Sequence, residues 1–283
     1  MNALRAAVLQ AVGTTARLAP AWMRAAAYKV PLLSDGVRRV LTWAAPGGRA
    51  VVVVAAGIAT GVRLRLDLKT EKYYWLGTHE AAVQQALARE TKPGMTVYDV
   101  GAHLGFFTLG LARLVGAGGR VVAFDPLPEN IRALRENLAL NPSLTSNVQV
   151  VQAAVANVSG QLRFYGGSDP SRARLAPLPA SSEDSQEVAS LTLDEFVFHR
   201  GVPAPQLVKL DVEGAEGVAL QGAQRLLREI KPLWILEMHG AEAAQAAWEE
   251  LRCADYKLLS LNRAREFQAP EEFTHSHLLA VPR

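Results

Sequence analysis

The sequence has little cysteine and no long apolar run. A single cysteine, Cys253, among 283 residues excludes an intramolecular disulfide framework and a multi-cysteine zinc site. The longest apolar run covers residues 50–58 and is too short to cross a bilayer. The first 20 residues lack the basic start, apolar core and cleavage site of a secretory signal. We therefore expect a cytoplasmic protein.

Charge of one sign is also scarce. The 30 Lys and Arg residues nearly balance the 27 Asp and Glu residues, so the formal net charge is only +3. The basic residues are scattered among acidic ones, and this pattern does not indicate a nucleic-acid partner. With 49% hydrophobic and 20% charged residues, the composition is that of a globular protein long enough for one large α/β domain with additions.

One turn stands at the centre of the chain. A β-branched, apolar run (residues 96–100) leads through Gly101 and Gly105 into an apolar run of helical type, which predicts a strand, a tight turn and a helix start. A dinucleotide-binding turn needs glycine where this chain has His103. Asp99 instead places a carboxylate at the strand end, which suits a positively charged ligand better than a pyrophosphate.

The next predicted strand, residues 120–124, ends in Asp125. A carboxylate at the second strand tip is where doubly wound folds bind ribose hydroxyls. A cationic amino-acid group and a ribose bound together describe S-adenosylmethionine.

Strands and helices alternate from residue 96 onward, which predicts a parallel sheet covered by helices on both faces. We expect strands at 96–100, 120–124, 147–152, 206–211 and 233–238, with helices at 106–116, 128–140, 193–199, 215–229 and 241–253. A closing hairpin of residues 257–261 and 277–281 adds an antiparallel strand. The fold class is therefore α/β, a doubly wound Rossmann-like sheet.

Residues 1–77 form an N-terminal helical and β-strand extension to the main domain, residues 78–283, which opens with a predicted helix at 78–90. Residues 1–33 have an apolar helical face, which predicts a helix that caps the domain or makes a homodimer contact. A membrane-surface helix is the less favoured alternative, because its polar face holds few cations. Alternating apolar residues predict strands at 50–56 and 62–68.

Residues 161–165 can form a strand, and residues 166–186 are rich in Gly, Ser, Pro, Ala and Asp and predict a surface loop. Such a loop beside the strand tips is either a lid or acceptor-binding wall, or an insert without function. The aromatic run at 73–75 is either core or a wall of an acceptor pocket.

A second motif lies near the end of the predicted sheet. One apolar strand carries Lys209 and ends at Asp211, and the neighbouring strand ends with Glu237 and His239. Open α/β sheets bind ligands at these carboxyl ends.

The chain at this point resembles the FkbM family of S-adenosylmethionine-dependent methyltransferases. The resemblance covers about residues 78–240 and rests on four segments in order: VYDVGAHLGFFT, VVAFDPLPENIRALRENLALN, LVKLDVEGAEGVALQGAQRLL and KPLWILEMHG. It implies a seven-stranded methyltransferase sheet and O-methylation. Two departures are Asp125, where the family often has Glu, and His103, where it often has Asn.

The resemblance also implies roles by position. At the methionine side of the cofactor, the lining residues are Gly101, Ala102 and Gly105, Asp99 lies near the ammonium group, and Glu80 lies near the methionine end. Asp125 takes the ribose hydroxyls. Pro126 borders the adenine, and Ala153 and Ala154 flank it. The acceptor is a sugar, polysaccharide or secondary-metabolite hydroxyl. An NAD(P)-dependent oxidoreductase and a non-catalytic binding module are the alternatives.

A hydroxyl acceptor must lose its proton, so a base or a metal is useful. In one version Asp211 or His239 takes the proton and Lys209 orients the group. In a second, Asp211, Glu237 and His239 hold Mg²⁺ or Mn²⁺. In a third, Lys209 forms a buried ion pair with Asp211 or Glu237 that braces the sheet.

Overall fold

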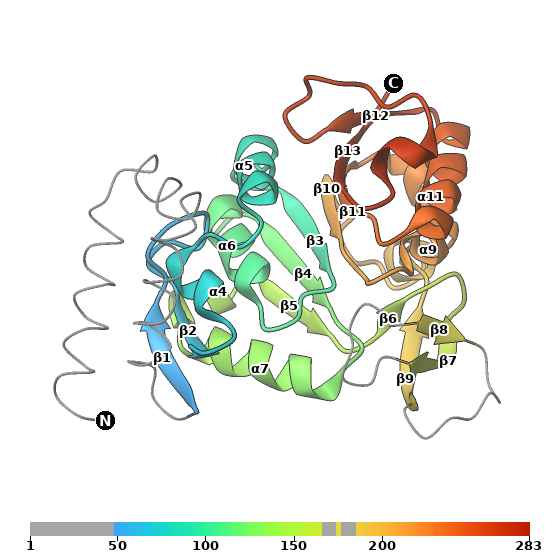
Figure 1. Cartoon of the computed structure of the whole chain (residues 1–283). Coiled ribbons are helices and arrows are strands. Elements are labelled where there is room, and N and C mark those ends of the chain that lie inside the picture. The colour runs from blue at the N-terminus through green and yellow to red at the C-terminus, as the bar shows by residue number, and fades with distance from the viewer. Residues whose placement is uncertain (1–47, 166–173, 177–184) are drawn as a thin grey trace, which may run out of the picture.

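The computed structural model describes residues 48–165, 174–176 and 185–283 (Figure 1). Its centre is a seven-stranded sheet in the order β12-β13-β11-β10-β3-β4-β5. The strands are β3 (Thr96–Val100), β4 (Arg120–Phe124), β5 (Val148–Val151), β10 (Leu207–Leu210), β11 (Leu233–Glu237), β12 (Tyr256–Ser260) and β13 (His277–Pro282). The predicted doubly wound α/β class is confirmed, and the winding reverses between β3 and β10.

Helices cover both faces of this sheet because its central strands are apolar on both sides. Successive side chains of β3 alternate, so that Val97 packs with one core cluster and Tyr98 with the other. The first cluster includes α5 (Ala81–Glu90), α6 (Phe106–Val115) and α7 (Pro128–Ala139), and the second includes α9 (Leu193–Phe198), α10 (Glu216–Gln221) and α11 (Ala241–Cys253).

β13 lies between β11 and β12 and runs antiparallel to both, as the closing hairpin predicted. A strand that runs backwards brings its first residue to the edge where the parallel strands end. His277 is therefore the direct partner of Glu237, the last residue of β11. This register adds an imidazole to the edge at which open α/β sheets bind ligands.

The N-terminal addition includes a separate antiparallel pair, β1 (Arg49–Val53) with β2 (Arg63–Asp67), as expected. Asn137 of α7 and Asn141, two residues beyond its end, complete the outer edge of β2 by pairing their amides with the main chain of Arg63 and Arg65. The pair thus shares the core with α7, and the boundary at residue 77 stays a prediction.

The predicted helix of residues 1–33 lies outside the described residues, as does most of the loop predicted at 166–186. Among the described residues, no helix is long and apolar enough to cross a membrane.

Residues 154–191 differ from the expectation. Besides the predicted strand β7 (Gly160–Tyr165), the chain forms β6 (Ala154–Val155), β8 (Arg174–Ala176) and β9 (Ser185–Leu191), which complete a small second sheet. The helix predicted at 215–229 is also divided, into α10 and the π-helix η2 (Leu226–Ile230). Gly222 lies between them and packs its backbone so closely on the Ala156 carbonyl that a Cβ would lie 1.9 Å from that oxygen.

Asn137→Ala is expected to lower the free energy of unfolding by about 1–3 kcal/mol, because it leaves buried main-chain groups without a hydrogen-bond partner. The Asn137 amide is fully buried, accepts from the Arg65 N–H at 2.7 Å and donates to the Leu104 carbonyl at 2.8 Å. Urea unfolding measures the change. Asn157→Ala is the control, since that exposed amide pairs only with the Gln221 side chain. Equal stability losses in the two variants would contradict the role of Asn137.

Candidate active site

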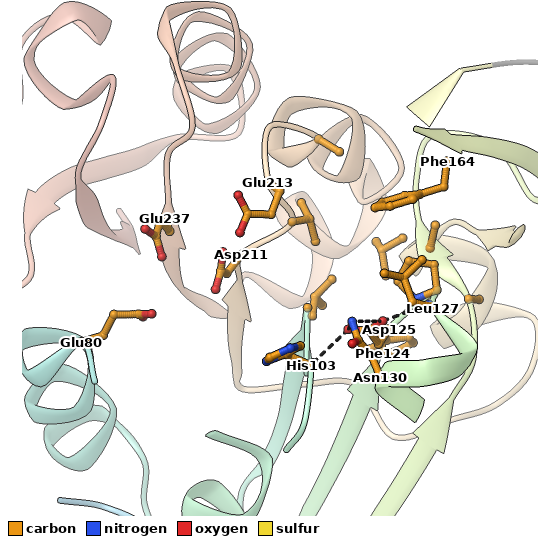
Figure 2. Close-up of a pocket in the computed structure, with 18 of the residues that line it drawn as sticks. Glu80, His103, Phe124, Asp125, Leu127, Asn130, Phe164, Asp211, Glu213 and Glu237 are labelled. Atoms are coloured by element: carbon orange, nitrogen blue, oxygen red, sulfur yellow. Dashed lines mark hydrogen bonds between the residues drawn. The ribbon is translucent and has the colours of Figure 1, made fainter. Parts of the chain in front are cut away.

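A cavity of about 490 Å³ opens at the carboxyl edge of the central sheet, where β3, β4, β10 and β11 end. Figure 2 shows Asp125 and Asn130 at one end, Glu80 and Glu237 at the other, and Asp211 with Glu213 between them. The volume is within the range typical of small-molecule sites. One half of the cavity is largely apolar, and the other is rich in carboxylates.

Asp125 forms the polar centre of the apolar half. It follows β4 and is only 4% exposed. Its Oδ2 accepts from the His103 N–H at 2.9 Å, its Oδ1 accepts from the Leu127 N–H at 3.0 Å, and the Asn130 amide donates to both oxygens. Burial raises the pKa of Asp125 although these donors oppose the shift. A carboxylate offers about four acceptor positions, so three donor groups hold this one rigidly and leave about one position for a ligand hydroxyl.

Apolar side chains surround this carboxylate. Phe124, Pro126, Leu127, Ala153, Ala154, Val155 and Phe164 line the cavity here. Phe164 comes from β7, in the small second sheet, and Figure 2 shows it above the group formed by Asp125, Leu127 and Asn130. The predicted positions Pro126, Ala153 and Ala154 therefore all lie in the wall, and Phe164 adds an aromatic face suited to a flat ring.

The glycines of the central turn permit close main-chain approaches. Gly101 has φ +83°, and a Cβ there would lie 1.7 Å from the Asp211 carbonyl oxygen. Gly105 has φ +91°, and a Cβ there would lie 2.4 Å from Cδ1 of Leu134 in α7. Gly101 lines the cavity, whereas Gly105 and Ala102 lie behind its wall. Glycine at 105 is thus explained by its positive φ and its close contact with Leu134.

Two residues expected to act in the site, Asp99 and Lys209, lie beneath it. They are register partners on β3 and β10, they are almost fully buried, and neither lines the cavity. Lys209 Nζ lies 3.0 Å from Asp211 Oδ2 and 3.8 Å from Asp99 Oδ1. Burial opposes its charge, but Asp211, Asp99 and Glu80 outweigh that effect and raise the pKa of Lys209. This geometry favours the bracing ion pair over direct contact with an acceptor.

The second half of the cavity is acidic. Glu80, Asp211, Glu213 and Glu237 line it together with Tyr73, Tyr74 and His79. The tyrosines belong to α4 (Lys72–Leu76), and their ring centroids are 4.6 Å apart. Tyr74 is buried and Tyr73 is 38% exposed, so the aromatic run is core and cavity wall at once, while Trp75 is core only. None of the described lining residues is Lys or Arg.

His239 stands just behind Asp211 and does not line the cavity. Its Nδ1 donates to Oε1 of the fully buried Glu216 at 2.9 Å, which fixes the orientation of the ring. Its Nε2 faces Glu213 at 3.4 Å, Glu237 at 3.6 Å and Asp211 at 4.0 Å. Burial favours the neutral ring, but Glu216, Glu213 and Asp211 outweigh it and raise the pKa of His239 to about 9. Asp211 is therefore better placed than His239 to meet an acceptor.

His277 was not among the expected site residues. It faces Glu237 and Glu80, at 3.1 and 3.6 Å, and these neighbours raise its pKa to about 9 against the effect of burial. Glu80 precedes α5 with φ +42°, which is uncommon for a non-glycine residue. Its partners His79 and His277 place it in the acidic half of the cavity. The sequence signal for His277 was the antiparallel closing strand, which brings residue 277 beside residue 237.

A family model described as the methyltransferase FkbM domain matches residues 99–258, more than half of the chain. The chain belongs to the FkbM family of S-adenosylmethionine-dependent methyltransferases. This membership favours methyl transfer over the chemistry of an NAD(P)-dependent oxidoreductase.

Two relatives in this family have names that state an activity. The 31-O-demethyl-FK506 methyltransferase FkbM of Streptomyces tacrolimicus is 32% identical over 165 residues, covering 48% of this chain and 62% of that protein. The hexuronic acid methyltransferase AglP of Haloferax volcanii is 26% identical over 237 residues, covering 82% of this chain and 94% of that protein.

A solved structure of methyltransferase FkbM from Methylobacillus flagellatus aligns with a TM-score of 0.46 and 15% identity, over 90% of this chain and 60% of that one. The matched region thus spans less than two thirds of both the Streptomyces relative and this solved chain.

Gly101→Ala is expected to destabilise this FkbM-family chain far more than Gly94→Ala. Both glycines have similar positive φ, +83° and +86°, but an added Cβ meets the Asp211 carbonyl at position 101 and nothing within 4 Å at position 94. The shared conformation costs roughly 1–2 kcal/mol in each variant, and only Gly101→Ala also forces β3 and β10 apart. Chemical denaturation compares the two. Equal losses would show that the close approach is unimportant.

Proposed function

We propose that the chain binds S-adenosylmethionine in this cavity and transfers its methyl group to a hydroxyl of a sugar, polysaccharide or secondary metabolite. The observation that supports the proposal best is Asp125, a buried carboxylate with spare acceptor capacity inside the apolar half of a cavity whose other half is acidic. A ribose with two hydroxyls, a flat apolar base and a cationic end match these three environments in that order.

In this arrangement Asp125 accepts from the ribose hydroxyls, and Pro126, Ala153 and Ala154 border the adenine with Phe164 across from it. The methionine end lies along Gly101, where a side chain has no room. Asp99 is completely buried, so its part is to hold Lys209 in place. Ala102 and Gly105 support the turn from behind. Glu80 lines the acidic half of the cavity, and its place near the methionine end stays a proposal.

The acidic half receives the acceptor. Its carboxylates accept hydrogen bonds from hydroxyl groups, and its half-exposed Tyr73 offers a flat apolar face beside them. The names of the two relatives, an FK506 derivative and a hexuronic acid, fit a hydroxyl-bearing acceptor. A small molecule or a glycan is therefore the proposed substrate.

When bound, the sulfonium supplies an activated methyl group. The acceptor oxygen attacks the methyl carbon in line with the carbon–sulfur bond. The new bond joins oxygen to the methyl carbon, the carbon–sulfur bond breaks, and the electron pair stays on sulfur. The hydroxyl proton goes to Asp211, which lines the cavity while Lys209 holds its Oδ2 at 3.0 Å. Lys209 is thus a positioning residue, and the protein contributes chiefly orientation and a base.

A variant of this proposal adds Mg²⁺ or Mn²⁺ at Asp211, Glu237 and His239. One ligand atom from each of these residues lies within 4.8 Å of the others. Two carboxylates and an imidazole suit a divalent ion, and such an ion lowers the pKa of a bound hydroxyl. The donor set fits, and Glu216 supplies the carboxylate behind the histidine that is usual at metal sites.

Asp125→Ala is expected to weaken binding of S-adenosylhomocysteine by about 1–3 kcal/mol, because the ribose hydroxyls lose a buried acceptor. Isothermal titration calorimetry measures this, and a 2′,3′-dideoxy analogue provides the control. The substitution is expected to change the affinity of that analogue little, since it has no hydroxyls to lose. If both ligands lose the same affinity, Asp125 acts on the shape of the pocket and its proposed contact with ribose is wrong.

Asp211→Asn is expected to slow methyl transfer at least about 100-fold while the affinity for S-adenosylmethionine stays within about twofold, because the base acts on the acceptor. Mass spectrometry of glycan and small-molecule extracts incubated with isotope-labelled cofactor identifies the methylated product and its rate of formation. Asp255→Asn, at an exposed carboxylate, is the control. Full activity of Asp211→Asn would reject Asp211 as the base. Cofactor binding with no labelled product from the unaltered chain would favour the non-catalytic alternative.

A further inference from the structure

Glu237 has two carboxylate oxygens, and they face two different histidines. Oε1 lies 3.6 Å from Nε2 of His239, and Oε2 lies 3.1 Å from Nε2 of His277. His239 approaches from the loop after β11, while His277 is the register partner of Glu237 on antiparallel β13. One carboxylate at the sheet edge is therefore shared between two donor groups.

Glu80 completes the second donor group. Its Oε2 lies 3.6 Å from Nε2 of His277, and the ligand atoms of Glu80, Glu237 and His277 all lie within 4.8 Å of one another. These residues come from the start of α5, the end of β11 and the start of β13, so three distant parts of the chain converge here. Adjacent ligand atoms about 2.1 Å from an octahedral ion lie about 3.0 Å apart, so the observed 3.1 and 3.6 Å need little adjustment to hold one.

Two of these atoms are buried and have no hydrogen-bond partner. They are Glu80 Oε2 and His277 Nε2. Their contacts are those of an ion pair, since His277 Nε2 lies 3.1 Å from Glu237 Oε2 and 3.6 Å from Glu80 Oε2. A buried polar atom without a partner is costly, and buried unpaired groups in native proteins often mark a site that binds an ion or water. Both orphaned atoms belong to this one donor group, so they point to a common ligand.

The charge around the group indicates the sign of that ligand. Glu80, Asp211, Glu213 and Glu237 all line the acidic half of the cavity, where none of the described lining residues is Lys or Arg. Lys209, His239 and His277 pair with these carboxylates and offset part of their charge. A multivalent cation in the cavity offsets the repulsion that remains. Two carboxylates and one imidazole are donors for a first-row divalent ion.

We propose that Glu80, Glu237 and His277 form a second divalent-cation site, joined through Glu237 to the one formed by Asp211, Glu237 and His239. The carboxylate of Glu237 bridges the two ions, with Oε2 in the new site and Oε1 in the other. Paired ions on a shared carboxylate favour an acceptor with two neighbouring oxygen atoms, one for each ion. This choice of acceptor rests on the proposed methyl transfer, whereas the cation site itself does not.

Manganese binding to the full-length chain tests the proposal. After dialysis against a chelator, the protein is titrated with Mn²⁺, and the loss of the free-ion signal in electron paramagnetic resonance counts the bound ions. The unaltered chain is expected to bind two Mn²⁺ ions, whose spectrum shows spin coupling when both are present. Glu80→Gln and His277→Gln are each expected to bind one ion without coupling, and His239→Gln also one.

Glu90→Gln is the matched control for Glu80→Gln, because the two glutamates lie at opposite ends of α5. Glu90 pairs with Arg263 and does not line the cavity. It is expected to bind two ions. Glu237→Gln, which removes the bridge, is expected to weaken binding of both ions by on the order of tenfold or more. Thermal unfolding of each variant shows whether it is folded.

The result that overturns the proposal is a single Mn²⁺ per unaltered chain, or none, or two that Glu80→Gln and His277→Gln leave in place. Calorimetric titration of the same samples with S-adenosylmethionine separates this failure from failure of the proposed function. A chain that binds the cofactor but a single ion loses only the second site. A chain that binds two ions but no cofactor loses the proposed methyl transfer.

Discussion

A buried cation joins the two strands on which the cavity rests. Lys209 projects from β10 beneath the cavity, faces Asp99 of β3, contacts Asp211 and lies 4.9 Å from the centroid of the Phe107 ring. Each of these charges would be unfavourable alone in this interior, and together they compensate one another. The carboxylate of Asp211 is thereby held in the wall of the cavity with one oxygen paired to Lys209. The arrangement couples sheet stability to the position of the proposed base.

The rest of the site follows from where strands end. Parallel β3, β4, β10 and β11 bring Asp125, Asp211 and Glu237 to one edge, and antiparallel β13 adds His277 from the opposite direction. The apolar half forms where short residues follow β5. The two halves differ in charge because one is built from alanine, proline and aromatic residues and the other from strand-tip acids.

The sequence predicted most of the sheet and the cavity wall, because both depend on local patterns. Apolar strands followed by glycine or a carboxylate located Gly101, Asp125, Asp211 and Glu237, and all of them line the cavity. The sequence left three roles for Lys209 open, because its ion pairs depend on how close Asp99 of the neighbouring strand and Asp211 lie to it in the folded sheet.

The small sheet of β6 to β9 was only partly predicted, because its strands pair over long sequence separations within a segment of loop-like composition. His277 was not predicted as a site residue for a related reason. Its role depends on its register with Glu237, which neither residue reveals alone. Phe164 reaches the cavity from the same small sheet and was equally hidden from local reasoning.

The central claim is that this edge of the sheet holds an adenosyl group with its ribose on Asp125. The most direct test is a crystal structure of the chain grown with S-adenosylhomocysteine. We expect electron density with the ribose hydroxyls on the Asp125 carboxylate, the adenine beside Ala153, Ala154 and Phe164, and the sulfur directed toward Asp211. Density for the nucleoside at another place on the protein, or in this cavity in the reverse orientation, would contradict it.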